Sequence, residues 1–194
     1  MTIQQVSRRA SRLAHVETDL IEAAKRMDPL AWDELYSEHH LPIFRYVFVR
    51  TRSAPVSEDI TADVFLEAVR GIRRYQHRGA PFRAWLYRIA HNLTVDHHKR
   101  TVRTVESLDG GRAAALHYGG DVPLRVAERD ALRGAISRLT PEQQQVVILR
   151  FIEGLSLEEV GAVTRRPKGS VKSMQHRALR RLRAILEEDN YVEL

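Results

Sequence analysis

The stretch LSLEEVGAVTRRPKGSVKSMQHRALRRLRAIL, from Leu155 to Leu186, has apolar spacing that predicts two helices joined by a tight turn. Ser156 and Glu159 form an S-x-x-E capping box, which satisfies free amides at a helix start, so the first helix begins near Ser156. Pro167 suits a first helical position, so a second helix follows from Pro167. The apolar residues of each helix recur at steps of three and four: Leu157, Val160 and Val163, then Val171, Met174, Ala178 and Leu182.

The second of these predicted helices is strongly basic. A basic helix after a tight turn is how a helix-turn-helix protein meets phosphates and base edges in the major groove of DNA. The alternative is a solvated helix hairpin, although acids usually balance the charge of a merely solvated helix face. The second helix has no acid before Glu187, and its cations are Lys168, Lys172, Arg177, Arg180, Arg181 and Arg183.

Composition restricts the partner and the compartment. The 194 residues suit one large domain or two small ones, and we expect two. The formal charge of +6 favours a polyanionic partner, either nucleic acid or an acidic membrane surface, but the basic segments lack the bulky apolar anchors of a membrane-surface helix. The lack of cysteine excludes disulfides and thiolate zinc sites. With no apolar run that could span a bilayer and no signal peptide, we expect a cytoplasmic protein without membrane insertion.

Glycines mark the best domain boundary. The segment 104–123 contains four of them and has no sustained periodicity, so we interpret it as a flexible tether. The pattern on both sides is helical throughout, which predicts an all-α fold. The expected organisation is an N-terminal tail at 1–16, a first domain at 17–103 and a second domain at 124–190. Before the helix-turn-helix, helices are predicted at 19–27, 30–39, 41–52, 57–75 with Ser57 as N-cap, 82–103, 124–139, and 141–153 with Thr140 as N-cap.

Charge divides the first predicted domain. Acids concentrate between 17 and 67, whereas 70–103 is rich in arginine and holds the single acid Asp96. The natural interpretation is a protein partner on the acidic face and nucleic acid on the basic face, although the acids could also form a simple ion-pairing surface. Aromatic residues lie among the cations, as stacking on unpaired bases requires. Phe82 and Trp85 fall at helical spacing and are predicted to pack in the core, whereas Tyr75 and Tyr87 are predicted to be exposed.

Three blocks of the chain, taken in order, resemble bacterial RNA polymerase sigma factors of the extracytoplasmic-function (ECF) group. They are SEDITADVFLEAV from Ser57, GAPFRAWLYRIAHNLTVDHHKR from Gly79, and LTPEQQQVVILRFIEGLSLEEVGAVTRRPKGSVKSMQHRALRRLR from Leu139. The resemblance implies a two-domain factor that binds core RNA polymerase and promoter DNA, helps to open the duplex and catalyses nothing. Such proteins are commonly held by an anti-sigma factor, so the resemblance also implies that partner.

The resemblance assigns roles by matched position. Asp59 and Asp63 would dock on core polymerase, although Ala62 stands where many relatives have glutamine. The loop at 76–80 would capture a base flipped from the minus-ten element, which suits a glycine that allows close backbone approach. The residues implied for the minus-ten element are His77, Arg78, Gly79, Asn92, Asp96, Lys99 and Arg100. Those implied for the minus-thirty-five element are Arg165, Arg166, Lys168, Ser170, Lys172, Ser173, His176 and Arg177.

Two other function classes compete with this interpretation. A one-component helix-turn-helix repressor or activator would bind its operator unaided, but it leaves the acidic and basic halves of the first domain without a purpose. An enzyme or metal site would need a cluster of ligands, and His91, His97 and His98 form no H-E-x-x-H or other zinc pattern. We therefore expect no catalytic residue, no metal and no cofactor. A sigma factor whose two DNA-binding domains are joined by a flexible tether would bind duplex promoter weakly on its own.

Overall fold

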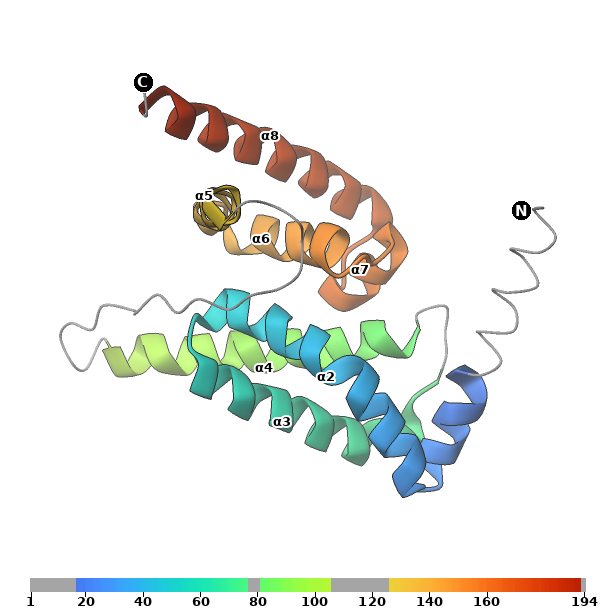
Figure 1. Cartoon of the computed structure of the whole chain (residues 1–194). Coiled ribbons are helices and arrows are strands. Elements are labelled where there is room, and N and C mark those ends of the chain that lie inside the picture. Colours follow the sequence, from blue (N-terminus) through green and yellow to red (C-terminus); the bar gives the residue numbers. More distant parts are fainter. Residues whose placement is uncertain (1–16, 77–80, 106–125, 193–194) are drawn as a thin grey trace.

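The computed structural model describes residues 17–76, 81–105 and 126–192, and the described part of the chain is helical without strands. Two groups of helices lie one above the other (Figure 1). In the lower group α2, α3 and α4 pack against one another, and in the upper group α8 packs against α5, α6 and α7. After a first helix at 17–25, the helices are α2 (Pro29–Thr51), α3 (Ala54–Gly71), α4 (Phe82–Val105), α5 (Val126–Ser137), α6 (Pro141–Val147), α7 (Leu157–Thr164) and α8 (Lys168–Val192).

The prediction of separate helices at 30–39 and 41–52 is wrong, because α2 runs through both. Asp28 caps this helix by accepting a hydrogen bond from the amide of Leu30 at 2.9 Å. Pro42 lies inside α2 and removes one backbone hydrogen bond. Leu35 before the proline and Ile43, Phe44, Tyr46 and Val47 after it are buried in the core, and this packing outweighs the lost hydrogen bond.

Ser57 is not the N-cap of the next helix. Helix α3 begins three residues earlier, at Ala54, after the extended residue Ser53, and Pro55 occupies its first turn. Ser57 is fully buried, and its hydroxyl donates to the carbonyl oxygen of Ser53 at 2.6 Å. The helix also ends earlier than predicted, at Gly71, and a short 3-10 turn continues to Arg74.

The predicted caps of the second domain are confirmed. Thr140 caps α6 and Ser156 caps α7, and each forms a reciprocal capping box with the residue three positions later, Gln143 and Glu159. The segment predicted as a helix at 141–153 changes to a π-helical turn at Ile148–Ile152. The second helix of the motif begins at Lys168, one residue after the predicted start.

One apolar cluster joins the two groups of helices. It contains Ile43, Val64 and Leu86 of the first group together with Leu149 and Val160 of the second. The two domains that the sequence separates by a flexible tether therefore share packed surface in this structure. Residues 106–125, which hold most of the predicted tether, and 1–16, the predicted tail, lie outside the described residues.

The aromatic residues of the first domain are more buried than predicted. Phe82 packs in the core as expected, but the prediction that Tyr75 and Tyr87 are exposed is wrong. The Tyr75 ring lies against the rings of Phe82 and Trp85, and the Tyr87 ring meets Tyr46 edge to face. Burial raises the pKa of Tyr75 to about 12. Helical spacing alone could not reveal these contacts, because they come from other elements.

None of the described helices combines the length and apolar character that a membrane crossing needs. Within the same described ranges, no group of three histidine, aspartate or glutamate side chains is placed to hold a metal ion.

Candidate nucleic-acid and protein interfaces

The helix-turn-helix is built around a close approach between α7 and the turn that follows it. Arg165 ends α7 in the left-handed conformation, with a φ of 55°, and the amide of Arg166 donates to the carbonyl oxygen of Gly161 at 3.0 Å. A Cβ at Gly161 would lie only 2.7 Å from the carbonyl oxygen of Arg166. Glycine is therefore the residue that lets the turn fold back on α7 and set the direction of α8.

The two sides of α8 are sharply different. Val171, Met174, Ala178 and Ile185 are buried, so the opposite side faces outward. All the residues implied for the minus-thirty-five element are exposed except Ser170, which is half-buried: Arg165, Arg166, Lys168, Lys172, Ser173, His176 and Arg177. The arrangement offers cations, a hydroxyl and an imidazole on one accessible surface, as reading a major groove requires.

Lys168 differs from the other cations of this surface. Its ammonium pairs with the carboxylate of Glu158, and this hydrogen bond lowers the pKa of Glu158. The pair lies between the start of α8 and the start of α7, so it ties together the two helices of the motif. Lys168 is therefore partly neutralised before any phosphate reaches it.

A second set of predicted residues forms an exposed stripe on α4. Asn92, Asp96, Lys99 and Arg100 are all exposed and succeed one another along the helix. The Arg100 guanidinium donates to the backbone carbonyl oxygen of Asp96 at 3.3 Å, which holds this side chain along the helix. The stripe combines an amide, a carboxylate and two cations.

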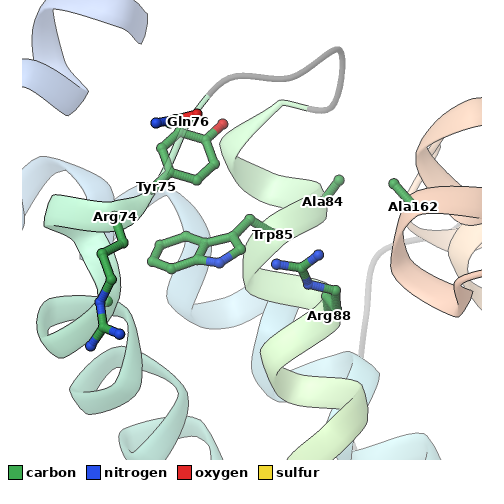
Figure 2. Close-up of a pocket in the computed structure, with 8 residues that line it drawn as sticks. Arg74, Tyr75, Gln76, Ala84, Trp85, Arg88 and Ala162 are labelled. Carbon is green, nitrogen blue, oxygen red and sulfur yellow. The ribbon is translucent and has the colours of Figure 1, made fainter.

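A cavity of about 630 Å³ lies near the beginning of the same helix (Figure 2). Trp85 and Arg88 of α4 line one side of it, Arg74 and Tyr75 line another, and Ala162 of α7 closes it from the second domain. The lining residue Gln76 immediately precedes the loop that contains His77, Arg78 and Gly79. These three residues lie outside the described residues.

Comparisons with known families settle what kind of protein carries this pair of surfaces. The family model described as Sigma-70 region 2 matches residues 35–104, and the one described as Sigma-70, region 4 matches residues 135–184. The RNA polymerase sigma factor CarQ of Myxococcus xanthus is 30% identical over 162 residues, which cover 81% of this chain and 90% of CarQ. The chain belongs to the sigma factor family. The first group of helices is thus region 2, and the second is region 4.

Further relatives place this sigma factor in the ECF group. The ECF RNA polymerase sigma factor BldN of Streptomyces coelicolor is 35% identical over 176 residues, and the match covers 88% of this chain. The ECF RNA polymerase sigma factor SigE of Mycolicibacterium smegmatis is 33% identical over 160 residues and covers 80% of this chain. The match spans 66% of the length of BldN and 62% of the length of SigE. Sigma factors are transcription initiation factors rather than enzymes.

Solved structures show the same fold. CnrH in complex with the cytosolic domain of CnrY aligns with a TM-score of 0.67 at 22% identity, covering 88% of this chain and 96% of that one. RpoE in complex with the anti-sigma factor NepR from Bartonella quintana aligns with a TM-score of 0.69 at 22% identity, covering 80% and 96%.

Region 2 of this sigma factor has an acidic face on α3. Asp59 and Asp63 are both exposed, as an interface with a partner requires. Sequence reasoning missed two exposed apolar residues of region 2: Leu66, one turn after Asp63, is 52% exposed, and Tyr36 of α2, whose ring meets Phe65 of α3, is 46% exposed. The sequence spacing could have revealed Leu66, because positions 59, 63 and 66 share one face of a helix.

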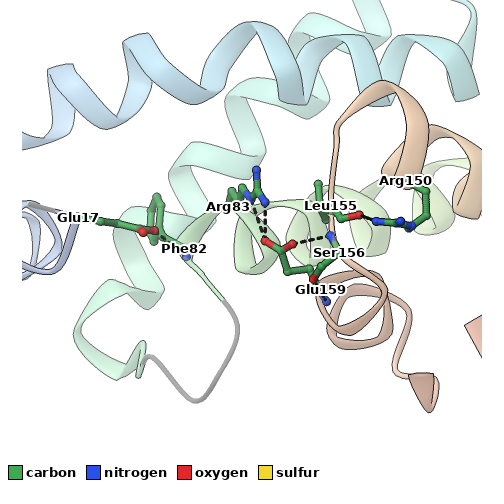
Figure 3. Close-up of polar contacts among 7 residues, drawn as sticks. All are labelled: Glu17, Phe82, Arg83, Arg150, Leu155, Ser156 and Glu159. Atoms are coloured by element: carbon green, nitrogen blue, oxygen red, sulfur yellow. Dashed lines mark hydrogen bonds and ion pairs between the residues drawn. The ribbon is translucent and has the colours of Figure 1, made fainter. Parts of the chain in front are cut away.

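Region 4 packs against α4 through a set of polar contacts that the sequence did not predict. Arg83 reaches Glu159 of α7 (Figure 3), Tyr87 donates to Glu153, and Gln145 donates to His91. Positions 83, 87 and 91 follow one another at steps of four and so share one face of α4. These three contacts, Arg83 with Glu159, Tyr87 with Glu153 and His91 with Gln145, are the interdomain seam.

Proposed function

We propose that this sigma factor binds core RNA polymerase and directs it to promoters with separate minus-thirty-five and minus-ten elements. One observation carries the proposal: a single chain exposes both a basic helix-turn-helix face on α8 and a polar stripe on α4, and its family is that of transcription initiation factors. A helix-turn-helix repressor would have no need of the second surface.

The upstream element is assigned to region 4. Lys172, Ser173, His176 and Arg177 are exposed on α8, and as side chains of a recognition helix they would meet base edges and nearby phosphates. Arg165, Arg166 and Lys168, in the turn and at the start of α8, suit contacts with the DNA backbone, and Ser170 completes the set as a hydroxyl at the edge of the surface.

The downstream element is assigned to region 2. The loop residues His77, Arg78 and Gly79 would receive an extruded base next to the cavity lined by Trp85 and Arg88. Asn92 offers an amide for paired hydrogen bonds to a base edge. Along the stripe, Lys99 and Arg100 would hold phosphates of the nontemplate strand, with Asp96 beside them.

Protein partners are assigned to the remaining surfaces. Asp59 and Asp63 would dock on core polymerase, and the exposed side chain of Leu66 would add apolar area to that interface. An anti-sigma factor is a further proposed partner, since the related RpoE of known structure is in complex with one. We place the protein in the cytoplasm, where the polymerase works, and assign it no catalytic residue, metal or cofactor.

The test is transcription by core polymerase with and without this protein on a library of randomised promoters. The proposal expects transcripts only when both proteins are present, from promoters enriched in two elements at a fixed spacing. Tight binding of a duplex operator by the protein alone, with nothing added by core polymerase, would instead favour the one-component repressor.

A further inference from the structure

The amino-terminal end of α4 is capped by a residue from another part of region 2. Pro81 precedes the helix, and proline has no side-chain oxygen that could accept a hydrogen bond from the first amides. Instead the amide of Phe82 donates to Oε1 of Glu17 at 3.2 Å (Figure 3). Glu17 lies 65 positions earlier, in the first helix at 17–25. The start of α4 therefore depends on a carboxylate that no local capping pattern supplies.

We propose that Glu17 is a positioning residue for the minus-ten element, which fixes the start of α4 and with it the cavity that receives an extruded base. This proposal rests on the proposed function for the identity of the ligand, and on the structure for the contact itself. Glu17 does not touch DNA in this role. It acts through Phe82 and through the aromatic rings that pack on Phe82.

The rings around Phe82 connect two walls of the cavity in Figure 2. Trp85 of α4 lines one wall and Tyr75 lines the other. Phe82 is fully buried, and its ring centroid lies 5.6 Å from that of Tyr75 and 5.4 Å from that of Trp85. The Tyr75 and Trp85 rings are themselves 5.0 Å apart. Because the three rings pack together, the hydrogen bond that holds the Phe82 backbone also sets the distance between the two walls.

The charge of Glu17 acts on groups from three other segments of region 2. Burial raises the pKa of Tyr75 to about 12, and the Glu17 charge contributes to the rise. Burial lowers the pKa of His39 in α2, and the charges of Glu38 and Glu17 partly offset this change. The His39 ring lies 5.7 Å from the Phe82 ring, measured between centroids. The Glu17 carboxylate thus lies where the first helix, α2, the residue before the loop and the start of α4 come together.

The same carboxylate occupies a position that would otherwise attract phosphate. A helix start carries free amides and a partial positive charge, which favour an anion. At α4 this anion is Glu17, which already accepts the Phe82 amide. The phosphates beside an extruded base would then meet Arg74 and Arg88, which line the cavity. Glu17 therefore keeps the DNA backbone away from the start of the helix and leaves the cavity to the base.

The first helix does not need Glu17 to stay in place. Ile21 and Ala24 of this helix are buried in the core, and the indole Nε1 of Trp32 donates to the carbonyl oxygen of Ala24 at 3.2 Å. These contacts hold the helix against α2. Removing the Glu17 carboxylate should therefore change the cap of α4 without unfolding region 2.

The test compares three variants in promoter opening by core polymerase. The promoter is one selected with the wild type from the randomised library, with 2-aminopurine in its minus-ten element to report unstacking. Glu17→Ala should slow opening by about fivefold, as loss of one N-cap would, and should leave preference for the minus-thirty-five element unchanged. Glu17→Gln should restore most of the rate, because its amide oxygen can still accept from Phe82. The matched control is Glu22→Ala, which removes a carboxylate of the same helix that pairs with Lys25 at 2.7 Å.

A second measurement does not depend on transcription. Hydrogen exchange of the Phe82 amide, followed by nuclear magnetic resonance, should be about fivefold faster in Glu17→Ala and unchanged in Glu22→Ala. Wild-type opening by Glu17→Ala, or a rate for Glu17→Gln as low as that for Glu17→Ala, would overturn the proposal. Unchanged exchange at Phe82 would overturn it as well. If the wild type opened no promoter while exchange at Phe82 changed as expected, the proposed function would fail and the cap would stand.

Discussion

Helices α4 and α8 are both basic, yet their faces meet different surroundings. Helix α8 buries Val171, Met174 and Ala178 inside region 4 and exposes most of the rest of its first half. Helix α4 buries an apolar face in region 2, turns a second face toward region 4 through Arg83 and His91, and exposes a third. The recognition helix of region 4 thus has one functional face, whereas the helix of region 2 has two.

This difference separates DNA chemistry from domain closure. A side chain on the exposed face of α8 is expected to affect DNA binding without moving region 4 away from α4. On α4 the two roles lie on neighbouring faces, since adjacent positions such as His91 and Asn92 are about 100° apart around the helix. Substitutions can therefore test whether the faces act separately.

The largest effect is expected on α8, from the double substitution Lys172→Ala and Arg177→Ala. Removing each side chain that meets a base should weaken use of the upstream element by about 1–3 kcal/mol. The measurement is transcription from promoters with an intact or a scrambled minus-thirty-five element, together with small-angle scattering of the free protein. The double variant should no longer distinguish the promoters and should keep the wild-type radius of gyration.

The control for this variant is Arg183→Ala, a neighbouring cation of α8 that pairs with Glu187 at 2.7 Å instead of belonging to the predicted DNA surface. It should leave promoter preference unchanged. A larger radius of gyration for the double variant would contradict the single role assigned to the exposed face of α8, because that face would then also help to hold region 4 against α4.

The features that the sequence predicted well are local ones. The capping boxes at Thr140 and Ser156 depend on residues three apart, so their identities alone determine them. The contact between His91 and Gln145 joins positions 54 apart in sequence, and no local pattern announces it. Tyr87 shows the same limit: its position suggested an exposed aromatic ring, but tertiary contacts with Tyr46 and Glu153 bury it.

The substitution Gly161→Ala should have the next largest effect, because it distorts the joint between α7 and α8. A methyl group there would meet the Arg166 carbonyl oxygen at 2.7 Å, and backbone must move to relieve the clash. We expect a loss of about 1–3 kcal/mol in the free energy of unfolding, measured with urea, and weaker use of the upstream element. This change would alter the direction of the α8 face without altering its chemistry.

Gly169→Ala is the matched control on the other side of the turn. A Cβ at Gly169 meets nothing within 4 Å, and the residue lies in α8. The variant should be unchanged or more stable, by up to about 1 kcal/mol, because alanine favours the helix. Equal destabilisation by the two substitutions would show that the close approach at Gly161 does not set the geometry of the motif.

A smaller effect is expected from Ser156→Ala, which separates the two roles of Glu159, in the cap of α7 and in the ion pair with Arg83. The substitution removes the hydroxyl that accepts the Glu159 amide at 3.1 Å, but it leaves Arg83 paired with the carboxylate. Loss of an N-cap should lower the free energy of unfolding by about 1 kcal/mol. Small-angle scattering should show no opening. An expanded free protein would mean that the cap, and not only the ion pair, holds region 4 on α4.

The smallest predicted effect is a pH dependence of closure that belongs to His91. Burial lowers the pKa of His91 to about 4 in the closed state, assisted by the charges of Arg50 and Arg165. The neighbours that face its ring are Tyr46 and Arg50 from α2, Gln145 from α6 and Arg165 after α7. An opened His91 returns to an ordinary pKa near 6.5, so the open state binds more protons below that pH. Closure should therefore weaken as pH falls from about 6.5 toward 4.

Glu153 opposes this trend, because burial raises its pKa and a falling pH then favours the closed state. The variant His91→Gln separates the two effects, since it keeps a polar side chain at the position and removes the titration. The radius of gyration of each protein is compared between about pH 7.5 and pH 5. Lowering the pH should shift the closed-to-open equilibrium of wild type toward the open state by about 1 kcal/mol more than it shifts that of the variant. This value is reduced because the ring is partly exposed to solvent. Identical pH profiles would show that titration of His91 does not affect the packing of region 4 on α4. The remaining titratable contacts of the seam are those of Glu153 and Glu159.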